Sequence, residues 1–441
     1  MNRTLLHQLK EWKTKKNRQP LILKGARQVG KTWLLTEFGR TDFSDTLYIN
    51  FEQIPGMEEI FEGVIEPEKI IDLLGAFLGR KIIPEKTLLI FDEIQEVPRA
   101  LTALKYFAEQ APQYPICCAG SMLGVALHKG TSFPVGKVDM LSLYPLSFQE
   151  FLEANLESEL IHYIEHAALN PFPLAFSNKL LDYLRLYFVI GGMPAVISTW
   201  LQERDFNQVD EKINTILDTY EQDFSKHASP SLVPKLRYIW NSIPSQLARE
   251  NRKFIYGLIK TGARAREYED ALLWLLDCGL IRKVGRISKG AHPLKAYEDL
   301  HAFKVYHLDI GLLRVMSGLS PKVITETTHI FEEFKGALTE QYVLQELAAM
   351  NIASVYYWTS EATAEVDFVF SKGTYILPLE VKGGENLRAK SLKIYRDTYH
   401  PAHAIRASLS NLRYDNGLLN IPLYTFFNMS RYLDAIDSQG Q

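Results

Sequence analysis

The sequence predicts an α/β protein of several domains that begins with a parallel β-sheet. Over the first ~150 residues, short apolar runs alternate with helical patterns, which is typical of strands whose connecting helices cover both faces of a sheet. The chain has 441 residues, 46% of them hydrophobic and 23% charged. It is therefore globular and long enough for about three to four compact units. The expected strands of the first sheet are 21–23, 46–51, 86–91 and 114–119.

The remainder of the chain predicts three further regions. Residues 156–228 follow a helical pattern. In residues 229–325, a helical stretch, a glycine and a strand-like run with basic residues indicate a winged helix-turn-helix. In residues 326–441, a helix that ends near Ala349 precedes strand-like runs at 355–359, 366–370, 375–382 and 423–427. We therefore expect domains at 1–155, 156–228, 229–325 and 326–441.

Composition and charge exclude several classes of protein. The net charge is −3 and the pI about 6.4, so no global basic field favours nucleic acid, and any such contact requires a local patch. The three cysteines, Cys117, Cys118 and Cys278, provide neither a disulfide framework nor a zinc-binding spacing. The N-terminus is too polar for a secretory signal, and no run approaches about 18 apolar residues. We expect a cytoplasmic protein without a membrane partner.

Residues 25–32, GARQVGKT, match the phosphate-binding loop G-x-x-x-x-G-K-[ST] at every position. The loop follows an apolar strand and precedes a helix, so backbone N–H groups and the helix dipole are expected to hold the phosphates of ATP. Lys31 is expected to reach the β- and γ-phosphates, and Thr32 to hold Mg²⁺. The expected nucleotide-binding residues are Gly25, Ala26, Arg27, Gln28, Val29, Gly30, Lys31, Thr32 and Trp33.

A second acidic motif follows the strand at 86–91. The apolar run Leu88–Phe91 ends in Asp92 and Glu93, which predicts two carboxylates at the edge of the sheet where the phosphate loop lies. Asp92 is expected to bind Mg²⁺, directly or through water, and Glu93 to polarise the attacking water. Ser121, after the next strand, is a candidate γ-phosphate sensor. Its alternative role is an ordinary helix N-cap.

Two carboxylates near the C-terminus predict a second site. Asp367 and Glu380 lie on two strand-like runs joined by a hairpin turn. If Lys372-Gly373 form a two-residue turn, Asp367 lies opposite Pro378 and diagonal to Glu380, on one face of the sheet. The two carboxylates are then placed to grip one divalent cation, Mg²⁺ or Mn²⁺, with the Lys382 ammonium beside them.

Glu340 is the third member of this expected site. It lies within an apolar face of the helix that precedes the hairpin, where an ionised acid is costly unless it is paired or bound to metal. A helical Glu followed by Asp…Glu-x-Lys on a hairpin is the layout of PD-(D/E)xK nucleases, in which a metal and a lysine activate water against a phosphodiester. The catalytic residues would be Glu340, Asp367, Glu380 and Lys382. The alternative for Glu-x-Lys alone is a cross-strand salt bridge.

Two groups of basic residues make DNA or RNA candidate partners. One group surrounds the second helix of the expected winged helix and comprises Arg264, Arg266, Arg282, Lys283 and Arg286. Such modules equally mediate protein packing. The other group follows the hairpin, where it faces phosphate or is an ordinary solvated helix face. It comprises Arg388, Lys390, Lys393, Arg396, Arg406 and Arg413.

The combination resembles the prokaryotic AAA-type ATPases that carry a C-terminal domain of unknown function numbered 4143. The shared motifs are GARQVGKT at 25–32, LLIFDEIQ at 88–95, AGSMLGV at 119–125, LYPLSFQEFL at 143–152, GGMPAVI at 191–197, YHLDIGLLRVM at 306–316, YYWTSEATAEVDFVF at 356–370 and PLEVKGG at 378–384. The resemblance implies a P-loop ATPase core, a helical region, a winged helix and a restriction-endonuclease-like C-terminal domain. Where the family usually has Gly-Arg-Val, this chain has Gly136-Lys137-Val138, so Lys137 retains the charge but not the planar fork of arginine.

The leading hypothesis is an ATP hydrolase with Lys31 and Glu93 as catalytic residues, coupled to a metal-dependent, nuclease-like domain that acts on or responds to nucleic acid. The alternative is an ATP-dependent switch or scaffold whose nuclease-like domain binds nucleic acid or protein without cleaving it. A third possibility is a chaperone-like or signalling ATPase that binds a protein partner or forms an oligomer through its winged helix. Metal binding that depends on Asp367 and Glu380 would separate the first two.

Overall fold

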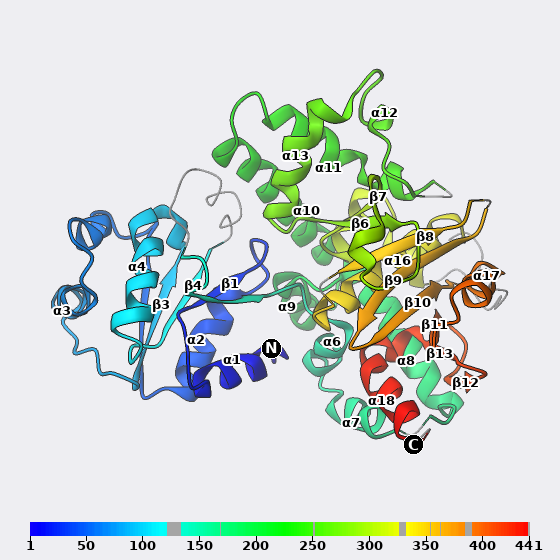
Figure 1. The fold of residues 1–441 in the computed structure, drawn as a ribbon, viewed down its shortest axis with the longest axis horizontal. Helices are drawn as coiled ribbons and strands as arrows, with labels where there is room; N and C mark the ends of the chain where they lie inside the picture. The colour runs from blue at the N-terminus through cyan, green and yellow to red at the C-terminus, as the bar shows by residue number, and fades with distance from the viewer. Residues whose placement is uncertain are drawn as a thin grey trace. The chain divides into compact units, whose positions relative to one another are not determined.

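The computed structural model describes residues 1–120, 134–167, 169–249, 252–325, 332–352, 354–361, 363–383 and 390–439. These residues form two compact units (Figure 1). The N-terminal unit consists of Asn2–Tyr144 and Asp277–Leu280, and the C-terminal unit of Pro145–Leu276 and Ile281–Gln441.

The N-terminal unit is built on a parallel five-stranded sheet with the strand order β2-β3-β4-β1-β5. The four strands expected from the sequence are present, and the short fifth strand, which was not predicted, pairs with β1. Because all five strands are parallel, their carboxyl ends meet at one edge of the sheet. The strands are β1 (Leu21–Lys24), β2 (Asp45–Asn50), β3 (Thr87–Asp92), β4 (Ile116–Ala119) and β5 (Asp139–Ser142).

Helices cover both faces of this sheet. One face packs its alternate side chains, such as Ile22, Leu89 and Phe91, against α3 and α4 in a continuous apolar core. Helix α2 packs against β2, β3 and β4. The three cysteines are buried free thiols. The helices of this unit are α1 (Leu5–Thr14), α2 (Lys31–Asp42), α3 (Pro67–Leu78) and α4 (Pro98–Gln110), and the short 3₁₀ turns are η1 (Met57–Phe61) and η2 (Ile94–Glu96).

The C-terminal unit begins with helices. A capping box starts α6, in which the Ser147 side chain accepts a hydrogen bond from the Glu150 N–H and the Glu150 carboxylate accepts one from the Ser147 N–H. The helices are α6 (Phe148–Ala154), α7 (Ser158–His166), α8 (Leu174–Ile190), α9 (Pro194–Glu203), α10 (Phe206–His227), α11 (Val233–Leu247), α12 (Tyr256–Ile259), α13 (Ala265–Asp277), α14 (Ile310–Met316), α15 (Pro321–Thr325), α16 (Glu332–Ala349), α17 (Lys390–Tyr399) and α18 (Met429–Gln439).

The break between α8 and α9 depends on two glycines. Gly191 has a φ of 74°, and a Cβ there would lie 2.2 Å from Oδ1 of Asp309. The Gly192 N–H donates to Oδ2 of Asp309 over 2.6 Å. Only residues without a side chain allow this approach. Within the described residues, no single helix is long and apolar enough to cross a membrane, and only α8 with α9, bent by 118°, pass that test as a pair.

The second sheet is mixed and has eight strands in the order β12-β13-β11-β10-β9-β8-β6-β7. It includes strands from both sides of the boundary expected between residues 325 and 326, so one sheet spans the two regions that the sequence assigned to a winged helix and a nuclease-like domain. The four-domain division stays a prediction. The strands are β6 (Ile281–Ile287), β7 (Glu298–His307), β8 (Val355–Thr359), β9 (Glu365–Lys372), β10 (Tyr375–Val381), β11 (Ala404–Ser408), β12 (Arg413–Asp415) and β13 (Leu418–Pro422).

Three of the four strands expected after residue 350 are present, and one prediction was wrong. Residues 423–427 lie in the 3₁₀ helix η4 (Leu423–Asn428) instead of a strand. Strand β13 ends at Pro422, which has no N–H to continue a ladder, and the aromatic residues that suggested a strand are buried in the turn that follows. Helices α11, α12 and α13 precede the antiparallel pair β6–β7. The winged-helix interpretation of this order remains a prediction.

Candidate functional site

The phosphate loop lies between β1 and α2, and its backbone adopts conformations that favour glycine. Gly30, with a φ of 95°, caps the N-terminus of α2, and a Cβ at Gly25 would lie 2.3 Å from the backbone oxygen of Leu143. The Lys31 ammonium donates to the carbonyl oxygens of Gly25 and Ala26, at 2.9 and 2.8 Å. The loop therefore closes around its own lysine.

The charge of Lys31 is only partly compensated by the protein. Only 7% of this residue is exposed, and burial lowers the pKa of its ammonium to about 8. The carboxylates of Glu93 and Asp92 oppose this shift without cancelling it. A buried cation of this kind, beside the N-terminus of a helix, favours an incoming anion.

Asp92 connects the loop to two neighbouring elements. Its Oδ2 accepts hydrogen bonds from the hydroxyl of Thr32 at 2.6 Å and from the hydroxyl of Tyr48 at 2.9 Å, while its Oδ1 accepts one from the Glu93 N–H. Thr32 and Asp92 were predicted from the sequence to hold the same Mg²⁺, and in the structure they are in contact. No role was predicted for Tyr48, whose pKa burial raises to about 12. The only sequence signal for Tyr48 was its place on a strand that ends at the same edge of the sheet.

Glu93 has a left-handed backbone conformation, with φ 50° and ψ 44°, which is uncommon for a residue with a side chain. Its Oε2 accepts a hydrogen bond of 2.6 Å from the Nε2 of Gln95. Gln95 is the last residue of the LLIFDEIQ motif, and no role was predicted for it from the sequence. Strained backbone at an acidic residue is a frequent property of functional sites.

Some expected residues add little here. Ser121 and Arg388 lie outside the described residues. Trp33 is 46% exposed and borders a hollow of about 480 Å³ along α2, together with Arg40 and Phe43. Lys137 forms an ion pair with Glu109, at 3.0 Å, between two side chains that both remain partly exposed.

The C-terminal hairpin differs from its expected register. The turn consists of Gly373 and Thr374, because Tyr375 pairs with Lys372, and Pro378 therefore lies opposite Val369. The prediction of a Lys372-Gly373 turn was wrong, because the turn lies one residue later in the chain. Each residue of β9 therefore pairs with a residue of β10 two positions further along than predicted. Continuing this register places Asp367 directly opposite Glu380 instead of diagonal to it, still on the same face.

Asp367 and Glu380 each have a further partner on strand β10 or just after it. Oδ2 of Asp367 accepts a hydrogen bond from the Val381 N–H at 2.7 Å. Oε1 of Glu380 lies 2.6 Å from the Lys382 ammonium, and its buried Oε2 has no hydrogen-bond partner among the described residues. Asp367 and Glu380 are thus adjacent, with Lys382 beside them.

Glu340 is bound mainly by residues that precede it in the chain. Its carboxylate accepts hydrogen bonds from the Arg252 guanidinium and, at 2.7 Å, from the Tyr306 hydroxyl. The Lys304 ammonium lies 3.9 Å from Oε2 of Glu340 and 2.6 Å from Oε1 of Glu365. Glu340 is 3% exposed and Lys304 fully buried. The expectation that this buried acid requires a partner is confirmed, and its partners are two cations, the Tyr306 hydroxyl and the Asp367 carboxyl.

These contacts shift the pKa values of the cluster. Burial disfavours ionisation of Glu340, but Lys304 and Arg252 outweigh it and hold the pKa of that carboxyl below its usual value. Burial raises the pKa of Asp367 well above its usual value, and the carboxylates of Glu340 and Glu380 raise it further. Glu340 is therefore the ionised member, and its charge is balanced internally.

Among the described residues, no group of three or more Asp, Glu, His or Cys side chains is arranged to hold a metal ion. Glu340 is bound by Arg252 and Lys304, and the two-carboxylate metal site expected at Asp367 and Glu380 stays a prediction. Neither cation was predicted from the sequence as a partner of Glu340. The sequence offered one sign that Lys304 is buried, because this lysine lies inside the largely apolar run Ala302–His307. It offered no such sign for Arg252.

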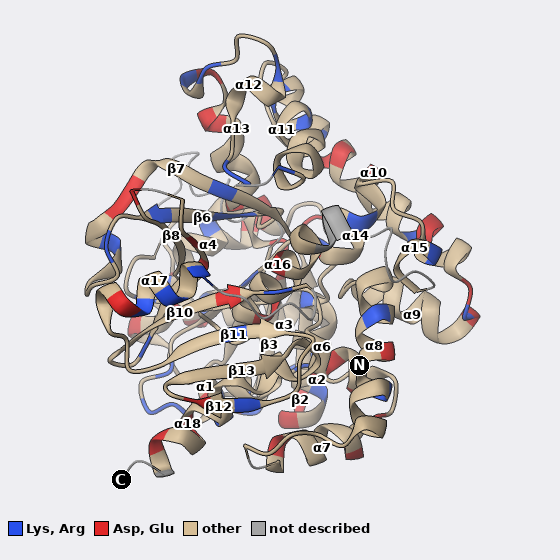
Figure 2. Ribbon diagram, turned by 90° about the vertical axis from the view of Figure 1, so that its right-hand side faces the viewer, with Lys and Arg blue, Asp and Glu red and all other residues tan. Residues whose placement is uncertain are grey.

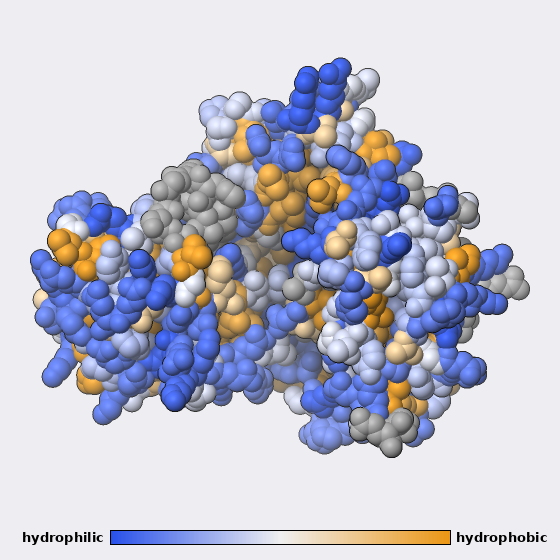
Figure 3. Space-filling model, viewed as in Figure 1, coloured by the Kyte–Doolittle hydropathy of each residue, from blue (hydrophilic) through white to orange (hydrophobic). Residues whose placement is uncertain are grey.

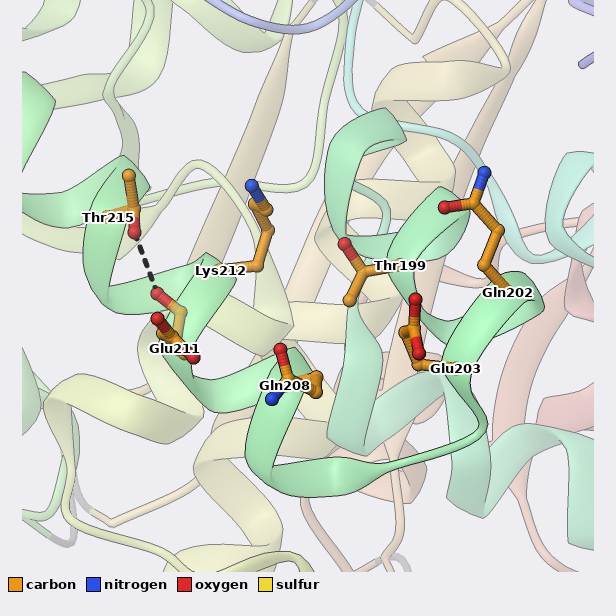
Figure 4. Close-up of a pocket in the computed structure, with 7 residues that line it drawn as sticks. All are labelled: Thr199, Gln202, Glu203, Gln208, Glu211, Lys212 and Thr215. Carbon is orange, nitrogen blue, oxygen red and sulfur yellow. Dashed lines mark hydrogen bonds between the residues drawn. The ribbon is translucent and has the colours of Figure 1, made fainter.

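Other surface features accompany these sites. A polar cavity of about 220 Å³ lies between α9 and α10, and Figure 4 shows its lining side chains, which include Glu203, Glu211 and Lys212. Around α12 and α13 both signs of charge are present (Figure 2), since exposed Arg264 and Arg266 are followed by exposed Glu267, Glu269 and Asp270. Apolar side chains are exposed in separate places (Figure 3). Leu73 and Phe77 of α3 belong to the exposed apolar residues.

Residues 17–152 match the family of AAA domains, residues 181–323 a domain of unknown function (DUF8612) and residues 335–426 a domain of unknown function (DUF4143). No curated protein shows significant sequence similarity to the chain.

Three solved structures resemble parts of it. The Walker-type ATPase PABY2304 of Pyrococcus abyssi is 16% identical, with a TM-score of 0.45, and the match covers 70% of this chain and 94% of that one. The Aeropyrum pernix ORC1 protein in complex with DNA is 13% identical, with a TM-score of 0.29, covering 72% and 93%. C. elegans PCH-2 is 13% identical, with a TM-score of 0.28, covering 48% and 68%. These scores are too low to transfer the fold or function of these proteins.

The family matches and the phosphate-loop geometry agree with each other. Residues 17–152 therefore form an AAA domain that contains the phosphate loop, and residues 335–426 match a DUF4143 domain.

Proposed function

We propose that the N-terminal unit binds ATP with Mg²⁺ and hydrolyses it. Lys31 would bind the β- and γ-phosphates, and the loop 25–32 would supply backbone N–H donors. Oxygen ligands suit Mg²⁺, and the hydroxyl of Thr32 and the carboxylate of Asp92, already in contact, would hold it. Bound there, Mg²⁺ would neutralise charge on the phosphate oxygens. Glu93 would accept a hydrogen bond from the water that attacks the γ-phosphorus.

The observation that carries this proposal is the buried Lys31 ammonium at the N-terminus of α2, which makes no direct ion pair among the described residues and which Asp92 and Glu93 compensate only in part. A buried cation is costly unless it gains a partner, and a phosphate provides one. In the free protein, the two carbonyls of the loop are weak substitutes for it.

Two variants test the proposal. Lys31→Ala should abolish ATP binding. Glu93→Gln should retain binding but lower kcat by about 10²–10⁴-fold, the usual contribution of a general base. Glu96→Gln, an exposed acid three residues further on, is the matched control and should leave kcat unchanged. Unchanged affinity in Lys31→Ala, or unchanged kcat in Glu93→Gln, would refute the assignment.

For the C-terminal unit, we infer a nucleotide-controlled switch or scaffold that binds nucleic acid or protein without cutting it. The supporting observation is the ion pairing of Glu340 with Arg252 and Lys304, because a carboxylate that is neutralised internally has little charge left for a metal. Exposed Arg264, just before α13, and exposed Arg413, in β12 near the opposite edge of the sheet, would be two separate phosphate contacts.

A metal-dependent nuclease is the second candidate. Asp367 opposite Glu380, with the Lys382 ammonium 2.6 Å from Glu380, favours it. Mixed DNA and RNA substrates should be incubated with Mg²⁺ or Mn²⁺, with and without ATP, beside an Asp367→Ala/Lys382→Ala double variant. The switch predicts no cleavage under any of these conditions while ATP hydrolysis is intact. Cleavage that is lost in the double variant would establish the nuclease instead.

A further inference from the structure

Gln95 lies in the 3₁₀ turn η2, directly after the acidic pair. Its amide nitrogen donates a hydrogen bond of 2.6 Å to Oε2 of Glu93. The orientation of the amide follows from chemistry, because a carboxylate accepts hydrogen bonds and only the nitrogen end of glutamine can donate one. The contact is short, as expected for a hydrogen bond to an ionised acceptor.

The turn that carries Gln95 is fixed on both sides. The Glu96 N–H donates to the Glu93 carbonyl oxygen at 3.0 Å, and the Val97 N–H donates to that of Ile94 at 3.2 Å. The side chain of Ile94 is fully buried in the core beneath the sheet. Gln95 therefore approaches Glu93 from a rigid backbone, which is how supporting residues hold a reacting group in place.

The other end of the same amide is not satisfied by the fold. Oε1 of Gln95 is buried and has no hydrogen-bond partner among the described residues. A buried amide that makes one hydrogen bond contributes little to stability, so its placement is better explained by what it does to Glu93.

We propose that Gln95 is a positioning residue for ATP hydrolysis, which holds the Glu93 carboxylate in the orientation that receives the attacking water. This inference rests on the proposed role of Glu93. In this role Gln95 acts through Glu93 and does not itself bind the nucleotide.

The competing explanation is that Gln95 only fills space in the turn. Three variants of the full-length chain distinguish the two. Gln95→Ala removes the donor and the volume, Gln95→Glu retains the volume but replaces the donor by a second negative charge, and Gln113→Ala removes an exposed glutamine that contacts Glu68. For each, kcat and KM for ATP hydrolysis and the Kd for ATP would be measured, in wild-type and Glu93→Gln backgrounds.

The positioning role predicts that Gln95→Ala lowers kcat by roughly tenfold, with KM and Kd nearly unchanged, because misplacing a reacting group affects the transition state more than binding. Gln95→Glu should lose at least as much, and Gln113→Ala nothing. In the Glu93→Gln background, Gln95→Ala should have no further effect, since the two residues act as one unit.

An unchanged kcat in Gln95→Ala would overturn the inference. A Gln95→Glu variant with the kcat of the wild type would also overturn it. The same holds if Gln95→Ala lowers kcat equally in the wild-type and Glu93→Gln backgrounds. If Glu93→Gln itself hydrolysed ATP normally, the proposed role of Glu93 would fail instead, so the two failures are distinguishable.

Discussion

Lys31 and Lys304 are both buried lysines close to carboxylates, but their surroundings are electrostatically opposite. Lys31 donates to backbone carbonyls, and burial lowers its pKa to about 8. Lys304 is completely buried, yet Glu340 and Glu365 outweigh the effect of burial and raise its pKa. The first lysine has charge available for a ligand, whereas the second has already been neutralised by the protein.

The difference shows that a buried lysine can mark either a ligand-binding site or an internal ion pair that links secondary-structure elements. A cation whose hydrogen bonds go to neutral carbonyls, and whose nearby carboxylates offset burial only in part, gains free energy when an anion arrives. A cation within hydrogen-bond distance of a carboxylate is already neutralised, so an incoming anion adds little free energy. Such an ion pair instead connects the elements that carry the two charges. Lys304 on β7 thus joins α16 and β9, which carry Glu340 and Glu365.

The largest test of this comparison is the loss of stability when each lysine loses its charge. Lys304→Met should lower the free energy of unfolding by about 3–5 kcal/mol, because it removes a cation from the buried Glu340 and the ion-pair partner of the partly exposed Glu365. Lys31→Met should change it by less than about 1 kcal/mol, because removing the buried charge also removes its desolvation cost. Urea unfolding followed by tryptophan fluorescence measures both. Equal losses would contradict the comparison.

The second test uses the lowered pKa of Lys31. In the nucleotide-free protein its ammonium loses a proton as the pH rises through about 8, whereas bound phosphate stabilises the protonated form. Below pH 8, affinity for ATP should not depend on this group. Above it, binding requires uptake of a proton, and the Kd should rise by up to about tenfold per pH unit.

Calorimetry between pH 7 and 9.5 would follow the Kd and, in buffers of different ionisation enthalpy, the proton uptake. Lys31→Arg is the control, because a guanidinium stays charged over this range and should bind with an affinity independent of pH. A wild-type Kd that stays constant to pH 9.5 would contradict the shift.

The smallest test concerns Gly336, one turn before Glu340 in α16. A Cβ there would lie 2.6 Å from Nη2 of Arg252, so the glycine leaves room for the guanidinium that binds Glu340. Gly→Ala inside a helix normally stabilises by about 1 kcal/mol. Here we expect Gly336→Ala to destabilise by about 1 kcal/mol, because displacing Arg252 weakens its ion pair with a buried acid.

The matched control places the same substitution in an Arg252→Met background. Without the guanidinium, the clash disappears, and Gly336→Ala should regain the ordinary stabilising sign. The same urea midpoints measure this reversal. A stabilising effect in both backgrounds would show that Arg252 does not need this space.

The phosphate loop could be predicted from the sequence because adjacent residues determine its backbone and its role. Thr32 and Asp92 could be brought together as well, since parallel strands end at one edge. Gln95 and Tyr48 were missed because a hydrogen bond between side chains leaves no periodic pattern. At the C-terminus, the acids were predicted but their cations were not, because Arg252 and Lys304 belong to distant segments that only tertiary packing brings to Glu340.

The hairpin shows a different limit. Asp367 and Glu380 were placed on one face correctly because alternation along a strand survives an even shift in pairing. Their exact pairing depended on which two residues form the turn, and both Lys372-Gly373 and Gly373-Thr374 offer a glycine. Residues 423–427 failed for another reason, since tertiary burial of aromatic side chains overrode their preference for strands.

The continuity of the eight-stranded sheet has a consequence for how this chain could have been assembled or divided. Strand β6 pairs with β8 through Gly285–Ile287 and Tyr356–Trp358, across the point where two domains were expected to separate. A chain divided at residue 325 would leave an unpaired edge on each piece, and such edges recruit other strands. We therefore expect the two parts to fold together, because each supplies the strand that covers the other's edge.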